Sequence, residues 1–164
     1  GFDLPPLMFD AEEVEAISVG LALLARTGDR GLVKAAQSVA AKIADVVPRH
    51  VMDSVDPGAL KVSSYGVSLP QHREIAPFRK AVRECRRLSI AYKDTAGRET
   101  RRTVLPVGIF YYVEVALLAA WCDLRQDFRH FRIDRIVSST ATGGTFDKEA
   151  RLRRKAWQAA HNDA

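Results

Sequence analysis

The stretch RQDFRHFRIDRI, residues 125–136, interleaves four arginines and a histidine with two phenylalanines and two isoleucines. Because side chains alternate across a β-strand, Arg129, Phe131 and Ile133 would share one face of an extended segment, and Arg132 would lie on the other. Neither face is uniformly apolar. The stretch therefore predicts a strand that borders a hydrophobic core and holds guanidinium groups at the edge of that core.

Spacing alone leaves two interpretations of these arginines open. In the first, they form ion pairs with nearby acids, for which Asp127, Asp134 and Glu114 are the candidates. In the second, they converge on an anion, because the guanidinium fork matches phosphate and carboxylate groups. Crowded arginines repel one another unless a counter-anion is present, and this favours the second interpretation.

The segments before and after this stretch predict a small β-barrel. Apolar residues that alternate, or run on between turn residues, indicate strands at 88–92, 100–112, 113–124 and 128–142. Pro106 does not suit a central strand and marks an edge, a bend or a bulge. Four or five short strands in so short a segment are typical of a closed or nearly closed barrel.

Two helices are expected to flank the strands. Pro77 suits the first turn of a helix that turns Phe78 inward and places Arg86 and Arg87 outward. Residues 147–162 predict a basic C-terminal helix. Its RLRRKAW segment is interpreted as a solvated face in preference to a nucleic-acid contact.

The N-terminal part predicts a helical hairpin. Asp10 and Glu13 have the spacing of a capping box, Gly28 suits a helix end, and Asp29 can cap a second helix over 30–47. This second helix is rich in alanine and has little bulk to bury by itself. We therefore expect the hairpin to pack on the rest of the chain, on an upstream segment, or on a second copy in a homodimer.

Residues 48–72 lose the helical periodicity and predict a linker, with a short helix near 49–55 and an extended piece near 60–69. The chain opens with GFDLPPLMF and without an initiator methionine, which suggests a fragment of a longer protein. The predicted domains are given by residue number: 1–56 helical linker and dimerisation region, 57–72 linker, 73–142 barrel domain, 143–164 turn and basic helix.

Charge and composition limit the classes of function that the chain can have. Residues 1–72 carry six Lys or Arg against nine Asp or Glu, whereas residues 73–164 carry nineteen against eleven. A basic C-terminal half favours an anionic partner such as nucleic acid, nucleotide or phosphate. No apolar run is long enough to span a membrane, and Cys85 and Cys122 are interpreted as reduced thiols of a cytoplasmic protein.

The sequence gives little support to a catalytic or metal-binding function. The sequence has no dinucleotide fingerprint, nucleophile elbow, Walker sequence or zinc-protease motif, and its cysteines and four histidines lack metal-ligand spacing. We expect no enzymatic activity, no metal and no cofactor.

The segment from AVRECRRLSIAY to RHFRIDRI resembles the WYL domain of bacterial transcriptional regulators of the DeoR/YafY type. The match includes Tyr92, Gly97, the segment RTVLP at 102–106, Trp121 and the closing RHFRIDRI at 129–136. The Trp-Tyr-Leu triplet that names the family aligns with Ala116, Leu117 and Leu118, so only the leucine is retained.

The resemblance implies an α+β chain whose helical hairpin is followed by a helix and a small Sm-like, SH3-type β-barrel. It also implies a missing N-terminal helix-turn-helix, through which alone such a protein would contact duplex DNA. The chain would then be the ligand-sensing and oligomerisation portion of a regulator. Its basic pocket for an anionic small molecule or single-stranded nucleic acid would be formed by Tyr92, Arg102, Arg125, Arg129, Arg132 and Arg135.

A second function stays open beside the first. A single-stranded nucleic-acid-binding module would use the barrel as a basic groove on which bases stack, and Phe128, Tyr111 and Tyr112 are the candidate stacking residues.

Overall fold

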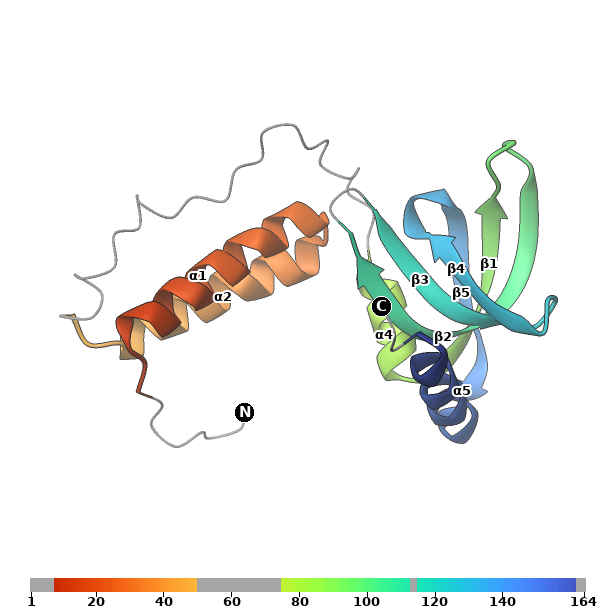
Figure 1. Ribbon diagram of the computed structural model, residues 1–164. Coiled ribbons are helices and arrows are strands. Elements are labelled where there is room, and N and C mark those ends of the chain that lie inside the picture. Colours follow the sequence, from red (N-terminus) through yellow and green to blue (C-terminus); the bar gives the residue numbers. More distant parts are fainter. Residues whose placement is uncertain (1–7, 50–74, 113–114, 162–164) are drawn as a thin grey trace.

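The computed structural model describes residues 8–49, 75–112 and 115–161 (Figure 1). The hairpin consists of α1 (Ala11–Leu24), a short 3-10 turn η1 (Ala25–Thr27) and α2 (Arg30–Val46). The remaining elements are α4 (Ala76–Arg83), β1 (Arg86–Lys93), β2 (Glu99–Tyr111), β3 (Ala116–Cys122), β4 (Asp127–Arg132), the 3-10 turn η2 (Ile133–Arg135), β5 (Ile136–Thr145) and α5 (Asp147–His161). The chain is α+β, as predicted.

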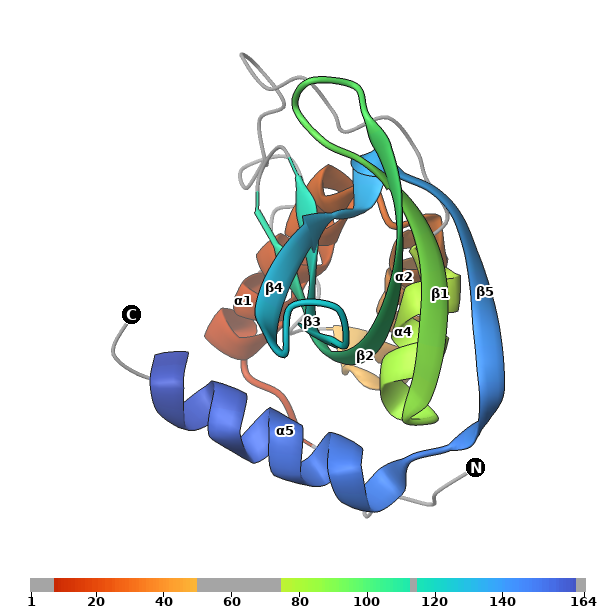
Figure 2. The same cartoon turned by 90° about the vertical axis from the view of Figure 1, so that its right-hand side faces the viewer.

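The five strands form one antiparallel sheet in the order β4-β3-β2-β1-β5. Figure 2 shows the sheet curling around its concave face, with α5 across one end. Among the described residues β4 and β5 remain the two edges, so the barrel is open rather than closed. The β2–β3 register shifts between Pro106 and Gly108, so of the three alternatives an edge is wrong, because β2 is a central strand, and a local irregularity such as a bulge is present.

The strand expected over 128–142 is in fact two strands separated by η2. Ile133 and Ile136 are both buried. Side chains three positions apart lie on opposite faces of one strand, so a turn is needed to bring both into the core. The continuous-strand prediction was wrong for this reason.

The main core fills the concave face of the sheet and is covered on one side by α4. Its best-buried members include Ile90, Val104 and Leu118, each 0% exposed. Phe78 of α4 and Phe131 of β4 join the same cluster. Phe131, Ile133 and Ile136, the apolar residues of the arginine-rich stretch, are all buried in this core.

Both predicted helix caps of the hairpin are present. The backbone N–H of Glu13 donates to the Asp10 carboxylate at 2.9 Å, and that of Asp10 donates to the Glu13 carboxylate at 3.0 Å. Gly28 has a φ of 69°, and Asp29 caps α2 by accepting from the backbone N–H groups of Gly31 and Leu32. The predicted pieces near 49–55 and 60–69 fall almost wholly outside the described residues.

The expectation for Arg87 was wrong, and the solvated face expected for RLRRKAW holds only for Arg151, Leu152, Lys155 and Ala156, which are exposed. Arg87, expected on an outer face, lies on β1 with its side chain 17% exposed and pairs with Asp123 and Glu149. In α5, Arg154 donates to the backbone carbonyl groups of Val107 and Val82, and the Arg153 guanidinium lies 3.4 Å from the centroid of the Trp121 ring. These arginines hold α5 against the sheet, so this side of the helix is not a solvated face.

Candidate functional site

A groove of about 900 Å³ opens at one end of the curled sheet. Four of the six predicted site residues line it: Tyr92, Arg102, Arg125 and Arg129. Its remaining lining residues are Asp94, Arg98, Glu99, Thr100, Cys122, His130 and Phe131. Residues that are far apart in sequence therefore line the same groove, and most of the charged residues among them are positive.

The strand register explains how apolar and basic residues share this face. Val104 lies opposite Leu88, so Arg102, two residues earlier on β2, lies on the same concave face. On β4, Arg129 is likewise two residues from buried Phe131 and shares its face. The interleaved sequence thus supplies core residues along the strands and arginines where the core ends.

Aromatic packing shapes the wall of the groove. The rings of Tyr92 and Phe131 meet edge to face with centroids 5.2 Å apart. Phe131 is 6% exposed and belongs to the core, whereas Tyr92 is half-buried and contacts that core from its edge. Tyr92 therefore has a fixed ring at the boundary between the apolar interior and the basic groove.

The arginines of the groove differ in how their charge is balanced. Arg98 donates from Nε to Asp94 at 2.9 Å, and Arg129 lies 3.3 Å from Asp127 in an exposed pair. Among the described residues, Arg102 and Arg125 have no carboxylate partner. Arg102 donates only to the carbonyl group of its neighbour Arg101, at 3.3 Å. Two guanidinium groups of the groove are thus left for an external anion.

The loop that joins β1 to β2 lies at the rim of the groove and is held by hydrogen bonds to Asp94. The Asp94 carboxylate accepts from the backbone N–H groups of Ala96 and Arg98 at 2.9 and 3.0 Å. The backbone N–H and then the guanidinium of Arg98 hold the pKa of Asp94 below its usual range. Gly97 takes the positive φ that this turn requires.

Arg132 and Arg135 lie outside the lining of the groove. Arg132 makes two hydrogen bonds to the Asp134 carboxylate, at 3.0 and 2.8 Å, and its guanidinium holds the pKa of that carboxyl below its ordinary value. The ion-pair interpretation is therefore confirmed for Arg132 and for Arg129, which pairs with Asp127, and the anion interpretation stays a prediction. Arg132 is an ion-pair residue, and Arg129 faces the groove.

The candidate stacking residues also lie away from the groove. Phe128 packs edge to face on Trp121 at 5.2 Å, and the Tyr111 hydroxyl donates to Asp29 at 2.9 Å. Tyr112 is exposed but does not line the groove. A base that entered the groove would meet Tyr92 and His130 instead.

The residues that replace the Trp-Tyr-Leu triplet lie at the other end of the sheet. Ala116 pairs with Tyr111, and Leu117 pairs with Phe110. Ala116 and Leu118 point into the core, and none of the three lines the groove. The substitution of this triplet therefore leaves the composition of the groove unchanged.

Sequence reasoning missed several groove residues, among them Arg98, Glu99 and Thr100. Their position in the β1–β2 hairpin places them beside Tyr92, because Thr100 pairs with Tyr92 and Glu99 pairs with Lys93. Pairing a predicted strand end with its hairpin partner would have found them.

Comparison with known proteins found two similarities. Residues 73–141 match the WYL domain family. A solved structure, proteasome accessory factor B/C (PafBC) of Arthrobacter aurescens, is similar with 26% sequence identity and a TM-score of 0.46. The match covers 90% of this chain and 22% of that one, so the chain spans about a fifth of its length.

The described residues show neither a membrane-crossing helix nor a group of metal ligands. No helix there is both long and apolar enough to cross a membrane. Nor do three or more His, Cys, Asp or Glu residues gather there in a way that could hold a metal ion.

Proposed function

We propose that this chain is the effector-sensing and assembly portion of a bacterial transcriptional regulator, and that its WYL domain binds an anionic, nucleotide-like effector. The observation that carries the proposal is the groove in which Arg102 and Arg125 have no carboxylate partner among the described residues. A mononucleotide would place its phosphate between these guanidinium groups and its base against Tyr92.

The assignment to a DeoR/YafY-type regulator belongs to the same proposal. It rests on the match of residues 73–141 to the WYL domain and on the helical hairpin that precedes it. In such a protein the hairpin would connect the WYL domain to a DNA-binding domain outside this chain. An effector would act by changing the relative populations of two hairpin positions.

Titration over a salt series tests the class of ligand. We expect a fluorescent nucleoside monophosphate to bind with a shallow dependence on salt, because only one phosphate is neutralised. A short labelled oligothymidine would show a slope of about −0.7 per neutralised phosphate if several phosphates were bound. A steep slope, with no mononucleotide binding, would favour the alternative function as a single-stranded nucleic-acid-binding module.

The hairpin is proposed to form a homodimer. Leu23, Val39 and Val46 are 45%, 42% and 65% exposed, and of the described residues of α1 and α2 only Val14 and Ala36 are buried. Association of two hairpins would cover these apolar side chains. Sedimentation equilibrium should show a dimer at high micromolar concentration, and a monomer under those conditions would contradict the proposal.

A further inference from the structure

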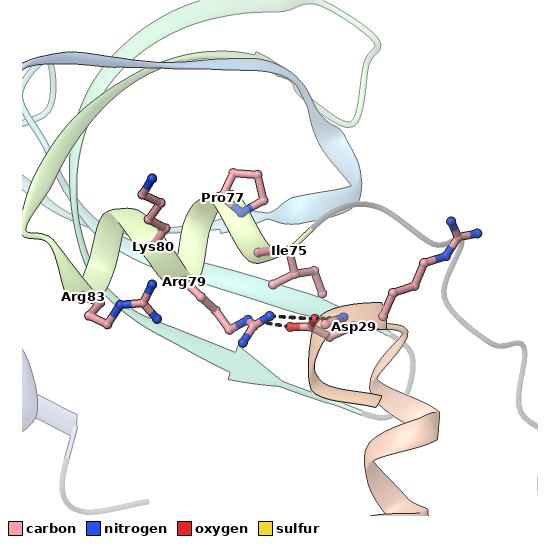
Figure 3. Close-up of a pocket in the computed structure, with 9 residues that line it drawn as sticks. Asp29, Ile75, Pro77, Arg79, Lys80 and Arg83 are labelled. Atoms are coloured by element: carbon pink, nitrogen blue, oxygen red, sulfur yellow. Dashed lines mark hydrogen bonds and ion pairs between the residues drawn. The ribbon is translucent and has the colours of Figure 1, made fainter. Parts of the chain in front are cut away.

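A single buried carboxylate ties the helical hairpin to the WYL domain. Asp29 is 1% exposed and caps α2. Its Oδ1 accepts a hydrogen bond from Arg79 of α4 at 3.1 Å, and its Oδ2 accepts one from the Tyr111 hydroxyl of β2 at 2.9 Å. The close contact of Arg79 Nε with Oδ2, at 2.9 Å, is an ion pair without hydrogen-bond geometry. Figure 3 shows Arg79 reaching from α4 toward Asp29.

The two bodies on either side of this contact have separate apolar cores. At the far end of the hairpin, Val14 and Val47 form a cluster of their own with Phe9, Ala11 and Ile43. Within the described part of the chain, the core of the WYL domain contains no hairpin residue. Crevices of about 520 and 250 Å³ flank the contact, and both have Arg79 in their lining. Polar bonds at Asp29, rather than a shared core, therefore hold the hairpin to the sheet.

Local sequence fits this close approach. A Cβ atom at Gly31 would lie 2.5 Å from Nη2 of Arg79. A glycine at this position lets the guanidinium reach the first turn of α2. Burial and the hydrogen bond to Asp29 raise the pKa of Tyr111 above its ordinary value, so its hydroxyl keeps the proton that it donates.

Strand β2 places this contact and the groove on one element. Thr100 and Arg102 lie near its start and line the groove, whereas Tyr111 is its last residue and bonds Asp29. A displacement of β2 along its length would therefore act on both.

We propose that Asp29, Arg79 and Tyr111 form a polar joint that sets the angle of the hairpin on the WYL domain. The joint has two states: closed, with both donors on the carboxylate, and open, with Asp29 separated from Arg79 and Tyr111 and the hairpin turned away from the sheet. Movement of the hairpin by an effector in the groove, through this joint, rests on the proposed function. The existence of the joint does not depend on that function.

Distances between spin labels in the ligand-free protein test the joint. Labels at Ser38→Cys on α2 and Thr140→Cys on β5 report the angle, because both positions are exposed and the native Cys85 and Cys122 are buried. The labelled chain is mixed with an excess of unlabelled protein, so that distances within one chain dominate, and the parent should then give one narrow distance distribution. Tyr111→Phe and Asp29→Ser should each raise the open fraction relative to the closed one by about tenfold.

The variants separate the joint from the folding of the helix. Serine is also a good helix cap, so Asp29→Ser keeps α2 capped while removing the charge and the reach to both donors. Tyr111→Phe leaves the cap untouched. Asp10→Ser makes the same change at the cap of α1, far from the joint, and should leave the distribution as in the parent. Circular dichroism should show equal helicity in all three.

The proposal of a joint would be contradicted if the distance distributions of Asp29→Ser and Tyr111→Phe superimposed on that of the parent. Addition of a nucleoside monophosphate then tests the proposed function separately. If the variants had a raised open fraction but the protein bound no nucleotide, the proposed effector groove would be refuted. The proposed joint would still be supported.

Discussion

Replacing both Arg102 and Arg125 by alanine is expected to weaken nucleotide binding by about 100-fold or more, because two charge-assisted contacts are removed together. Stability of the ligand-free protein should change by less than about 0.5 kcal/mol, or rise slightly. Neither arginine has a carboxylate partner among the described residues, so their removal breaks no ion pair there and lessens like-charge repulsion. Fluorescence titration and thermal unfolding of the same preparations measure the two effects.

The matched control is Arg132→Ala with Arg135→Ala, which removes the same net charge from the same domain. Both residues lie outside the groove, and Arg132 is bonded to Asp134. This pair of substitutions should leave nucleotide affinity within about threefold, the residual long-range charge effect. Equal losses of binding in the two double variants would mean that net charge, and not the groove, attracts the ligand.

Arg87→Ala is expected to destabilise the folded protein by about 2–3 kcal/mol. The guanidinium donates to Asp123 and Glu149, at 2.6 Å in each case, and lies 4.8 Å from the centroid of the Phe146 ring. Its side chain is 17% exposed and those of the acids are 35% exposed, so partial solvation keeps the effect below that of a fully buried pair. Denaturant unfolding at neutral pH measures the change.

Arg86→Ala supplies the control for Arg87, because it changes the neighbouring residue of the same strand. Arg86 pairs with Glu84 in a more exposed contact, at 43% and 31% exposure, and its loss should cost less than about 1 kcal/mol. If the two variants were equally stable, the pairing of β1 with α5 through Arg87 would contribute nothing, and the account of how α5 is held would be wrong.

Local sequence signals were sufficient to predict the helix caps of the hairpin. Asp10 with Glu13, and Gly28 with Asp29, make their caps within a few residues, so the sequence could predict them. The other partners of Asp29 lie 50 and 82 residues away, and those of Arg87 lie 36 and 62 residues away. Such contacts depend on the fold as a whole. For this reason Arg87 was assigned to an outer face, and Asp29 was seen only as a cap.

The same distinction applies to the groove. The WYL resemblance implied Tyr92, Arg102, Arg125 and Arg129 as pocket residues, and all four line the groove. Arg132 lies on β4 but on the face opposite Arg129, and Arg135 lies in the turn Ile133–Arg135, so neither lines the groove. The spacing of Ile133 and Ile136, both apolar and three residues apart, was the local sign of that turn.

The most direct test of the groove is an NMR titration of arginine Nε–Hε resonances with a nucleoside monophosphate. The account predicts saturable shifts for Arg102 and Arg125, a smaller shift for Arg129, and none for Arg132 in its pair with Asp134. Shifts confined to Arg132 and the arginines of α5, with Arg102 and Arg125 unmoved, would contradict it.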